Sequence, residues 1–212
     1  MSHQKAPFEG VFLCFVELLD IIRTMKKRSL SFYFGNILLL AALLGFFYIF
    51  WPIFQIYVFP PQMLTNLPEK GMFITIPKIH AQSPVIIGVD PNNQAVYDEA
   101  LQHGVAQAKG TSLPGETGTV YLFAHSSGPV WDQTHFNTIF LRLGELQKGD
   151  QIMLRKDGKD YYYTVRESKV VSPTAVSYLE NTKRTQLIIQ TCTPIGTSLY
   201  RLLVFADPIK NN

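Results

Sequence analysis

The sequence is poor in charged residues, and this shortage narrows what the protein can be. Of its 212 residues, 17% are charged and 47% are hydrophobic, a balance too apolar for an intrinsically disordered chain. It has 14 glycines and 13 prolines, and no unit of about 20 to 50 residues repeats, which excludes collagen-like, low-complexity and solenoid architectures. The chain is long enough for one ordinary globular domain and a further segment.

An excess of basic charge is also missing. The 19 Lys and Arg residues exceed the 16 Asp and Glu residues by only 3. The first 60 residues hold 5 bases and 3 acids, so the remainder has 19 − 5 = 14 bases and 16 − 3 = 13 acids and is nearly neutral. Nucleic-acid binding depends on a basic face that offsets the phosphate charge. We therefore predict no nucleic-acid partner.

No charged residue occurs between Arg28 and Glu69. Residues 37–59 are almost purely apolar, and at about 1.5 Å per residue they can cross a hydrocarbon core of about 30 Å as a helix. We predict a transmembrane helix over residues 36–59 that contacts membrane lipid. The alternative is a cleaved signal peptide, whose apolar core would be shorter, about 7–15 residues, and nearer the start of the chain.

The bases around this apolar stretch lie on one side of it. Residues 23–28 hold four bases, and no base follows the stretch until Lys70. The positive-inside rule then places the N-terminus in the cytoplasm and the following domain outside a single-pass cell-membrane protein. The expected divisions are a cytoplasmic segment 1–35, the helix 36–59, a linker 60–70 and an extracytoplasmic domain 71–212.

Short β-rich runs dominate the outer domain. Turn residues separate them, and Asp157-Gly158 is typical of a hairpin. Only residues 93–104 and 136–146 have helical spacing of apolar residues. Many strands and few helices predict a small barrel or sandwich. The expected strands are residues 72–76, 85–89, 120–124, 151–155, 161–171, 186–191 and 200–205.

Cysteine is almost absent, and the two cysteines cannot pair with each other. Cys14 lies on the cytoplasmic side of the predicted helix and Cys192 on the outer side. A lone outward-facing thiol is typical either of a reactive cysteine or of a small buried hydrophobic residue, and both interpretations stay open.

Three residues with useful chemistry stand at the ends of predicted strands. Cys192 ends one apolar run, and Arg201 opens the next, which we expect to pair with it as an antiparallel strand. His125 ends an earlier strand. A cysteine nucleophile needs a nearby base or cation, and acyl transfer needs a donor aimed at the developing oxyanion, which an arginine can supply. Together the three residues favour acyl transfer by a thiol.

The residues around Cys192 resemble the sortase family, the membrane-anchored cysteine transpeptidases of bacterial surfaces. The likeness covers residues 71–207. The subclass stays open because isoleucines stand at 188 and 189, where the family has Thr and Leu, and because Ala124 stands where a glycine often precedes the histidine. The matching pieces are Thr191-Cys192-Thr193-Pro194-x-Gly196-x4-Arg201-Leu202-x-Val204, Gly110-Thr111-x2-Pro114-Gly115-Glu116-x-Gly118 and Phe136-x6-Leu143-x5-Gly149-Asp150-x-Ile152.

This resemblance implies a mainly β fold, a closed eight-stranded barrel with one or two short helices after a single transmembrane helix. It implies Cys192 as nucleophile, Arg201 as oxyanion donor and His125 as the acid and base. The implied substrate is a secreted protein with a C-terminal LPxTG-like sorting signal, transferred through a thioacyl enzyme to an amine of a peptidoglycan peptide or a pilin lysine. No lid anchor of the Asp-Pro-aromatic type occurs in residues 60–70, so an unlidded site is expected.

The resemblance also places a peptide groove beside residues 172–185, although packing explains the same side chains equally well. The candidate substrate contacts are Thr191, Ala175, Val176, Tyr178 and Leu179.

The sequence also bears on a metal site and on functions other than that of a sortase. The spacing of His80, His103 and His135 does not match a zinc site, so neither a metal nor a cofactor is expected. Two alternatives stay open: a catalytically idle, membrane-tethered peptide-binding domain, and a simple cysteine peptidase.

Overall fold

The computed structural model describes residues 30–59, 61–125, 139–179, 184–195 and 197–209. Two compact units divide the chain, residues 1–52 and 53–212. Helix α2 (Leu30–Val58) begins in the first unit and ends in the second, and all the described strands lie in the second.

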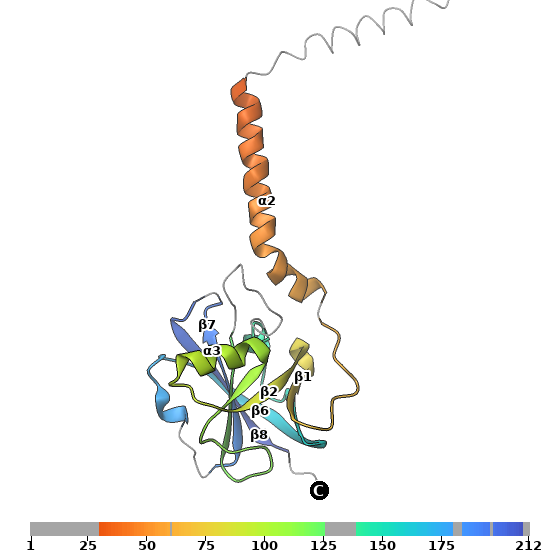
Figure 1. The fold of residues 1–212 in the computed structure, drawn as a ribbon, viewed down its shortest axis with the longest axis vertical. Helices are drawn as coiled ribbons and strands as arrows, with labels where there is room; N and C mark the ends of the chain where they lie inside the picture. The colour runs from red at the N-terminus through yellow and green to blue at the C-terminus, as the bar shows by residue number, and fades with distance from the viewer. Residues whose placement is uncertain (1–29, 60, 126–138, 180–183, 196, 210–212) are drawn as a thin grey trace, which may run out of the picture. The chain divides into compact units, whose positions relative to one another are not determined.

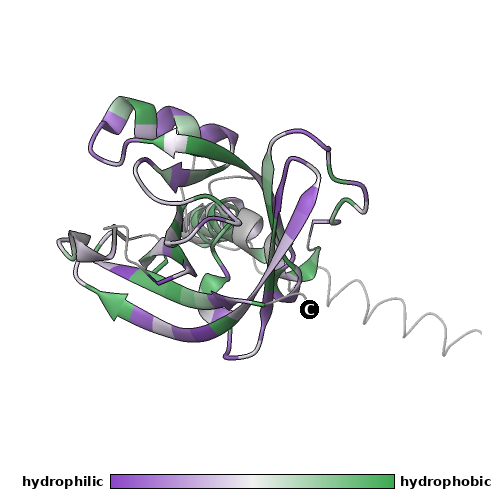
Figure 2. Ribbon diagram, turned by 90° about the horizontal axis from the view of Figure 1, so that it is seen from below, coloured by the Kyte–Doolittle hydropathy of each residue, from purple (hydrophilic) through white to green (hydrophobic). Residues whose placement is uncertain are grey.

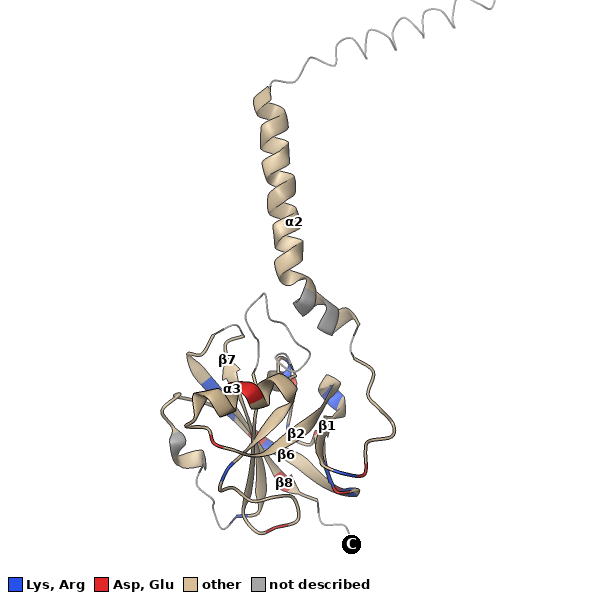
Figure 3. Cartoon of the chain, in the orientation of Figure 1, with Lys and Arg blue, Asp and Glu red and all other residues tan. Residues whose placement is uncertain are grey.

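Helix α2 is long and apolar enough to cross a membrane, and its candidate spanning part is Leu30–Trp51. No charged residue interrupts it (Figure 3). The helix begins six residues before the expected start at residue 36. Neither proline nor charge interrupts residues 30–35, and the Asn36 amide donates to the Phe32 carbonyl at 2.9 Å.

The second unit contains a closed β-barrel, which confirms the predicted fold class (Figure 1). The order around the barrel is β1-β2-β3-β4-β7-β8-β6-β5. The parallel pairs are β2 with β3 and β4 with β7, and the other neighbours are antiparallel. The strands are β1 (Met72–Ile76), β2 (Ala81–Val89), β3 (Val105–Ala108), β4 (Thr119–Phe123), β5 (Gln151–Lys156), β6 (Lys159–Val171), β7 (Gln186–Thr193) and β8 (Tyr200–Pro208).

Seven of these strands match the predicted runs, and the predicted hairpin joins β5 to β6 with Asp157 and Gly158 at positive φ. Strand β3 was not predicted. It has only four residues, Val-Ala-Gln-Ala, and alanine and glutamine have little intrinsic preference for strands. Pairing on both edges, with β2 and β4, compensates for that weak preference.

Alternate side chains of the strands fill the barrel. On β4 and β7 the inward residues are Val120, Leu122, Leu187 and Ile189, each at most 1% exposed. The opposite, outward side of the same strands carries Tyr121, Phe123 and Ile188, each at most 2% exposed, and the ring of Tyr97 from α3 stacks on Phe123. Both faces of these strands are therefore packed, which accounts for their nearly continuous burial.

Helix α3 (Gln94–His103) confirms the prediction of a helix over residues 93–104. The Asn93 side chain caps it by accepting from the Val96 backbone N–H. The helix carries both hydrophobic and hydrophilic residues (Figure 2) and buries Ala100 and Leu101. It ends at Gly104, where a Cβ would lie 2.4 Å from the Pro84 carbonyl oxygen of β2. Only glycine permits this close approach, which fixes the end of α3 against the barrel.

The helix predicted over residues 136–146 is wrong for its described part, residues 139–146. Residues 139–142 form turns, and a 3-10 helix, η3, covers Leu143–Glu145. Ile139, Phe140 and Leu143 are nonetheless buried. The helical spacing therefore reflects side chains that a loop inserts into the core, and it does not report an α-helix.

Residues before β1 are attached to the barrel. The Leu64 backbone exchanges two hydrogen bonds with the Gln82 side chain of β2, at 2.7 and 3.2 Å. Leu67 is 9% exposed, and its carbonyl accepts from the Arg155 guanidinium of β5 at 3.5 Å. Part of the expected linker is thus packed against the domain that it precedes.

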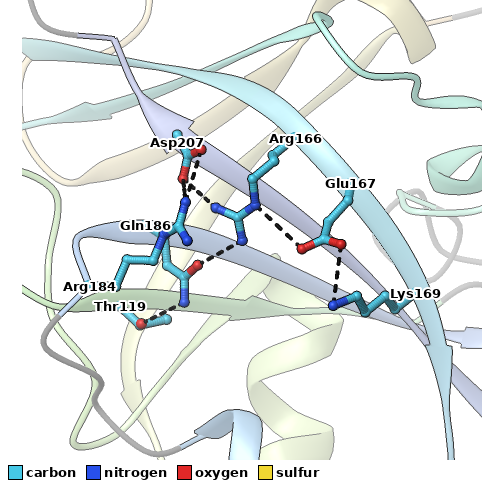
Figure 4. Close-up of polar contacts among 7 residues, drawn as sticks. All are labelled: Thr119, Arg166, Glu167, Lys169, Arg184, Gln186 and Asp207. Carbon is cyan, nitrogen blue, oxygen red and sulfur yellow. Dashed lines mark hydrogen bonds and ion pairs between the residues drawn. The ribbon is translucent and has the colours of Figure 1, made fainter.

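A polar network joins four strands at one end of the barrel (Figure 4). Arg166, the extra residue at a bulge in β6, donates to Asp207 of β8 and to Gln186 of β7. Gln186 donates in turn to Thr119 of β4 at 3.3 Å, and Arg184 also donates to Asp207, at 3.0 Å. The network fixes the relative positions of the strands that also carry the candidate site.

Candidate active site

The three predicted catalytic residues gather on the outer side of β4, β7 and β8. Directly paired residues of neighbouring strands point to the same side of a sheet, so the register arranges these side chains in rows. Cys192 and Arg201 form the last row, with His125 two residues beyond the end of β4. The rows before it are Tyr121, Ile188 and Phe205, and then Phe123, Gln190 and Leu203.

Cys192 and Arg201 are direct partners across the antiparallel β7–β8 pair. The predicted pairing of these two strands is therefore confirmed. Cys192 is a free, partly exposed thiol. The Arg201 Nη1 donates to the Ser198 carbonyl at 3.0 Å and to the Tyr200 carbonyl at 3.4 Å, which holds the guanidinium near the start of β8.

His125 reaches this row because β4 runs parallel to β7. Phe123 is the partner of Gln190, and beyond it the Ala124 N–H donates to the Gln190 carbonyl at 3.2 Å. The Thr191 hydroxyl donates to the Ala124 carbonyl at 3.1 Å. These bonds continue the alignment past the end of β4, so the half-buried His125 follows at the end of β7 that carries Cys192.

Tyr97 of α3 is a residue of this site that the sequence analysis missed. Its ring stacks on Phe123, with centroids 5.2 Å apart and planes at 10°. It also meets the His125 ring edge to face, at 5.9 Å and 80°. The sequence gives one signal that could have found it: Tyr97 is an aromatic residue within the helix predicted over residues 93–104.

Burial decides the protonation states of these side chains. It lowers the pKa of His125 below its usual value, and the nearby Asp98 carboxylate partly opposes this shift. Burial raises the pKa of Tyr97 to about 12, and the charges of Cys192, Arg201 and Asp98 also act on its hydroxyl. Near neutral pH the imidazole is therefore mainly neutral and the phenol fully protonated.

The predicted substrate contacts occupy two places. Thr191 is only 3% exposed, and its hydroxyl is used in the bond to Ala124. The other four lie in or beside a 3-10 helix, η4 (Val176–Leu179), which follows β6. Within it, the Tyr178 ring contacts the Phe205 ring edge to face at 5.8 Å, and Ala175 precedes it and is partly buried. Tyr178 thus covers the outer side of β8, the side that carries Arg201.

A polar pair lies between these aromatic contacts. The Tyr121 hydroxyl donates to the Gln190 side-chain oxygen at 2.6 Å. Gln190 is partly exposed and stands two residues before Cys192 on the same side of β7. The floor of the candidate site therefore includes an amide whose oxygen is fixed by a phenol.

The described part of the chain holds no group of three or more His, Cys, Asp and Glu side chains arranged to bind a metal. His103 is at the end of α3, where its Nδ1 lies 2.9 Å from the Glu99 carbonyl, and His80 occupies the left-handed turn after the 3-10 helix η1 (Pro77–Ile79). His135 lies outside the described residues.

The chain is similar to known proteins over this barrel. Residues 74–209 match the family described as the sortase domain. Sortase D of Bacillus subtilis (strain 168) is 30% identical over 150 residues, which are 67% of each chain.

Solved structures give the same result. A pilus-related sortase C of Group B Streptococcus is 31% identical, with a TM-score of 0.55 over 68% of this chain and 70% of that one. Sortase C-1 from Actinomyces oris is 28% identical, with a TM-score of 0.56 over 76% of this chain and 82% of that one. The domain match and these relatives, all over the part of the chain that forms the barrel, show that the protein belongs to the sortase family.

Proposed function

We propose that the protein is a cysteine transpeptidase that cuts a C-terminal sorting signal and joins the shortened protein to an amine. The observation that carries this proposal is the last row of the outer face, where Cys192 is paired with Arg201 and His125 follows two residues beyond the end of the adjoining strand β4. A nucleophile, a permanent cation and a titratable acid are then within one row of the sheet.

In the proposed acylation, the Cys192 thiolate attacks the carbonyl carbon of a Thr–Gly-like bond. Arg201 N–H groups donate to the oxyanion that forms. The C–N bond then breaks as the His125 imidazolium gives its proton to the leaving amine, and a thioester to Cys192 remains. In the second half, an acceptor amine loses a proton to His125 and attacks the thioester, and the C–S bond breaks.

The low pKa of His125 bears on the rate of this cycle. Acylation needs thiolate and imidazolium together, whereas an imidazole with a lowered pKa is mostly neutral near pH 7. Only a small fraction of molecules is then ready to react, and we expect slow turnover.

The groove for the sorting signal would lie along the outer side of β7, with η4 as its wall. In this proposal Ala175 and Tyr178 contact an apolar side chain of the signal, whereas the side chains of Val176 and Leu179, the other two predicted contacts, lie outside the described ones. Thr191 would act indirectly, because its hydroxyl donates to the carbonyl of Ala124, the residue before His125.

Helix α2 would anchor the enzyme in the cell membrane with the barrel on the outer side. The expected acceptors are amines at the bacterial surface, either of a peptidoglycan peptide or of a pilin lysine. The names of the structural relatives include a pilus-related sortase, which supports the second class. No cofactor enters the proposed steps.

The test uses the full chain in detergent with a library of LPxTG-like peptides and a set of amines, with products identified by mass. We expect peptide–amine conjugates that form only when Cys192 is present. Acid products alone, unchanged by added amine, would indicate a peptidase. Peptide binding without any product would indicate an idle binding domain.

A further inference from the structure

Tyr97 lies between a rigid aromatic residue and the candidate catalytic histidine. One side of the contact is the parallel stack on Phe123, a β4 residue that is only 2% exposed. The other is the edge-to-face contact with His125, at 5.9 Å between ring centroids. Because Phe123 is paired with Ala106 of β3 and with Gln190 of β7, Tyr97 rests on a fixed support.

The backbone of Tyr97 is fixed as well. It lies in the first turn of α3, and its N–H donates to the Asn93 carbonyl at 2.9 Å. At the other end of the helix, Gly104 lies against Pro84 of β2. The capped first turn, together with the contact of Gly104 on β2, gives the tyrosine ring little freedom to move away from the imidazole.

His125, in contrast, has little support of its own. It follows the last paired residue of β4 and belongs to no strand or helix. The Asp98 carboxylate of α3 acts on its ring, and the Tyr97 ring contacts it, while the charges of Cys192 on β7 and Arg201 on β8 act on the Tyr97 hydroxyl. An imidazole at a strand end keeps its orientation only if neighbouring side chains restrict its rotation.

We propose that Tyr97 is a positioning residue of the active site, whose ring, supported by Phe123, fixes the His125 imidazole and shields it from water. The inference rests on the proposed function, because it gives His125 a role in the reaction. It assigns the effect to the aromatic ring and not to the hydroxyl, since Tyr97 contacts both Phe123 and His125 through its ring.

Loss of the Tyr97 ring should change kcat in two opposite ways. Water would reach the imidazole, so the pKa of His125 should rise toward its ordinary value of 6.5. The imidazolium fraction at pH 7 then increases, which by itself favours acylation. Loss of orientation acts against the reaction, since a displacement of about 1 Å can lower a rate about 100-fold. A fall in kcat despite more imidazolium therefore identifies positioning.

The experiment compares Tyr97→Phe, Tyr97→Leu and Tyr97→Met in the full chain in detergent. The first keeps the ring, and the other two replace it with flexible aliphatic side chains that we expect to leave part of the imidazole open to water. Histidine-labelled protein is titrated by NMR, with His125→Gln used to assign the His125 signal. Val96→Ala, on the exposed side of the same turn of α3, is the matched control, and circular dichroism melts show which variants are folded.

We expect Tyr97→Phe and Val96→Ala to keep the His125 pKa and to keep kcat within about twofold. The folded ring-less variants should raise that pKa and lower kcat about 10- to 100-fold, with a smaller change in KM. An unchanged His125 pKa in both ring-less variants overturns the inference. An effect of Tyr97→Phe as large as that of Tyr97→Leu also overturns it, because the hydroxyl would then be responsible.

The titration needs no substrate, so this inference and the proposed function can fail separately. If no peptide is transferred but the His125 pKa still depends on the ring, only the transpeptidase proposal fails. If peptides are transferred, and both the His125 pKa and kcat stay unchanged when the ring is removed, only the role of Tyr97 fails.

Discussion

Cys192 and Arg201 face each other directly across β7 and β8, so the thiol and the guanidinium leave the sheet on the same side. Arg201 lies nine positions after Cys192 (201 − 192), and its Nη1 is held by the carbonyls of Ser198 in the connecting turn and of Tyr200 at the start of β8. The pair is thus set by strand register, and substitutions at either position test chemistry more than folding.

Replacement of Cys192 by alanine should abolish both cleavage and amine transfer and leave the fold intact. Thioester formation needs the sulfur, and the chain has no other cysteine in the barrel. Mass analysis of products from sorting peptides measures the loss. Cys14→Ala is the matched control and should be fully active. Transfer by the Cys192→Ala variant would contradict the whole mechanism.

Arg201→Lys should lower turnover about 100-fold or more, although it keeps the positive charge. An arginine can aim two N–H groups at one oxyanion, whereas the lysine ammonium is a point charge on a flexible stem. Steady-state kinetics on the peptide measures the change, with Arg201→Ala expected to be equal or worse. Near-normal turnover of the lysine variant would mean that only the charge matters.

Asp98→Asn should change the pH dependence in a defined direction. The Asp98 carboxylate raises the pKa of His125 and so opposes the lowering by burial. Without it, the His125 pKa falls further, the acid limb of the pH–rate profile moves to lower pH, and the maximum falls because thiolate and imidazolium coexist less often. The limbs report the coupled pair and not single residues. A shift of the acid limb to higher pH would contradict the assignment.

The choice of histidine is tested separately. His125→Gln should leave almost no transfer at any pH, because glutamine can neither donate a proton to the leaving amine nor accept one from the acceptor. His103→Gln, at the end of α3, and His135→Gln should leave the profile unchanged. Loss of activity in either control would show that another histidine is the acid.

Arg166→Met should lower stability but leave the chemistry of Cys192 intact. The Arg166 guanidinium, 23% exposed, donates to Asp207 and to Gln186. A hydrogen bond that involves a charged group contributes about 1.5–3 kcal/mol to the free energy of unfolding. We expect the free energy of unfolding to fall by about 1–3 kcal/mol, measured by urea denaturation. Lys169→Met, with a more exposed side chain, is the control and should cost less.

The sequence predicts the barrel well because its strands are local patterns. Strand Met72–Ile76 begins and ends where predicted, and Asp157-Gly158 marks the hairpin by conformational preference alone. The loop containing Phe140 was mistaken for a helix, because apolar spacing reports which residues are buried and not the backbone that buries them.

The candidate site also contains residues that the sequence predicts and residues that it does not. Cys192, Arg201 and His125 stand at visible strand ends, so residue type and position point to them. Tyr97 joins them only through the packing of α3 on β4, a contact between segments that no local pattern connects. Gln190 could not be predicted either, since its bond to Tyr121 depends on the parallel register of two strands that are far apart in the sequence.

The parallel pairing of β4 and β7 has a consequence for how the enzyme matures. The bond from Thr191 to Ala124 spans 67 residues, and contacts of such high sequence separation raise the contact order and slow folding. Since parallel strands cannot form a hairpin, the thiol meets its acid only when the barrel closes. Cys192 and His125 therefore come together late in folding, and the proposed chemistry depends on a closed barrel.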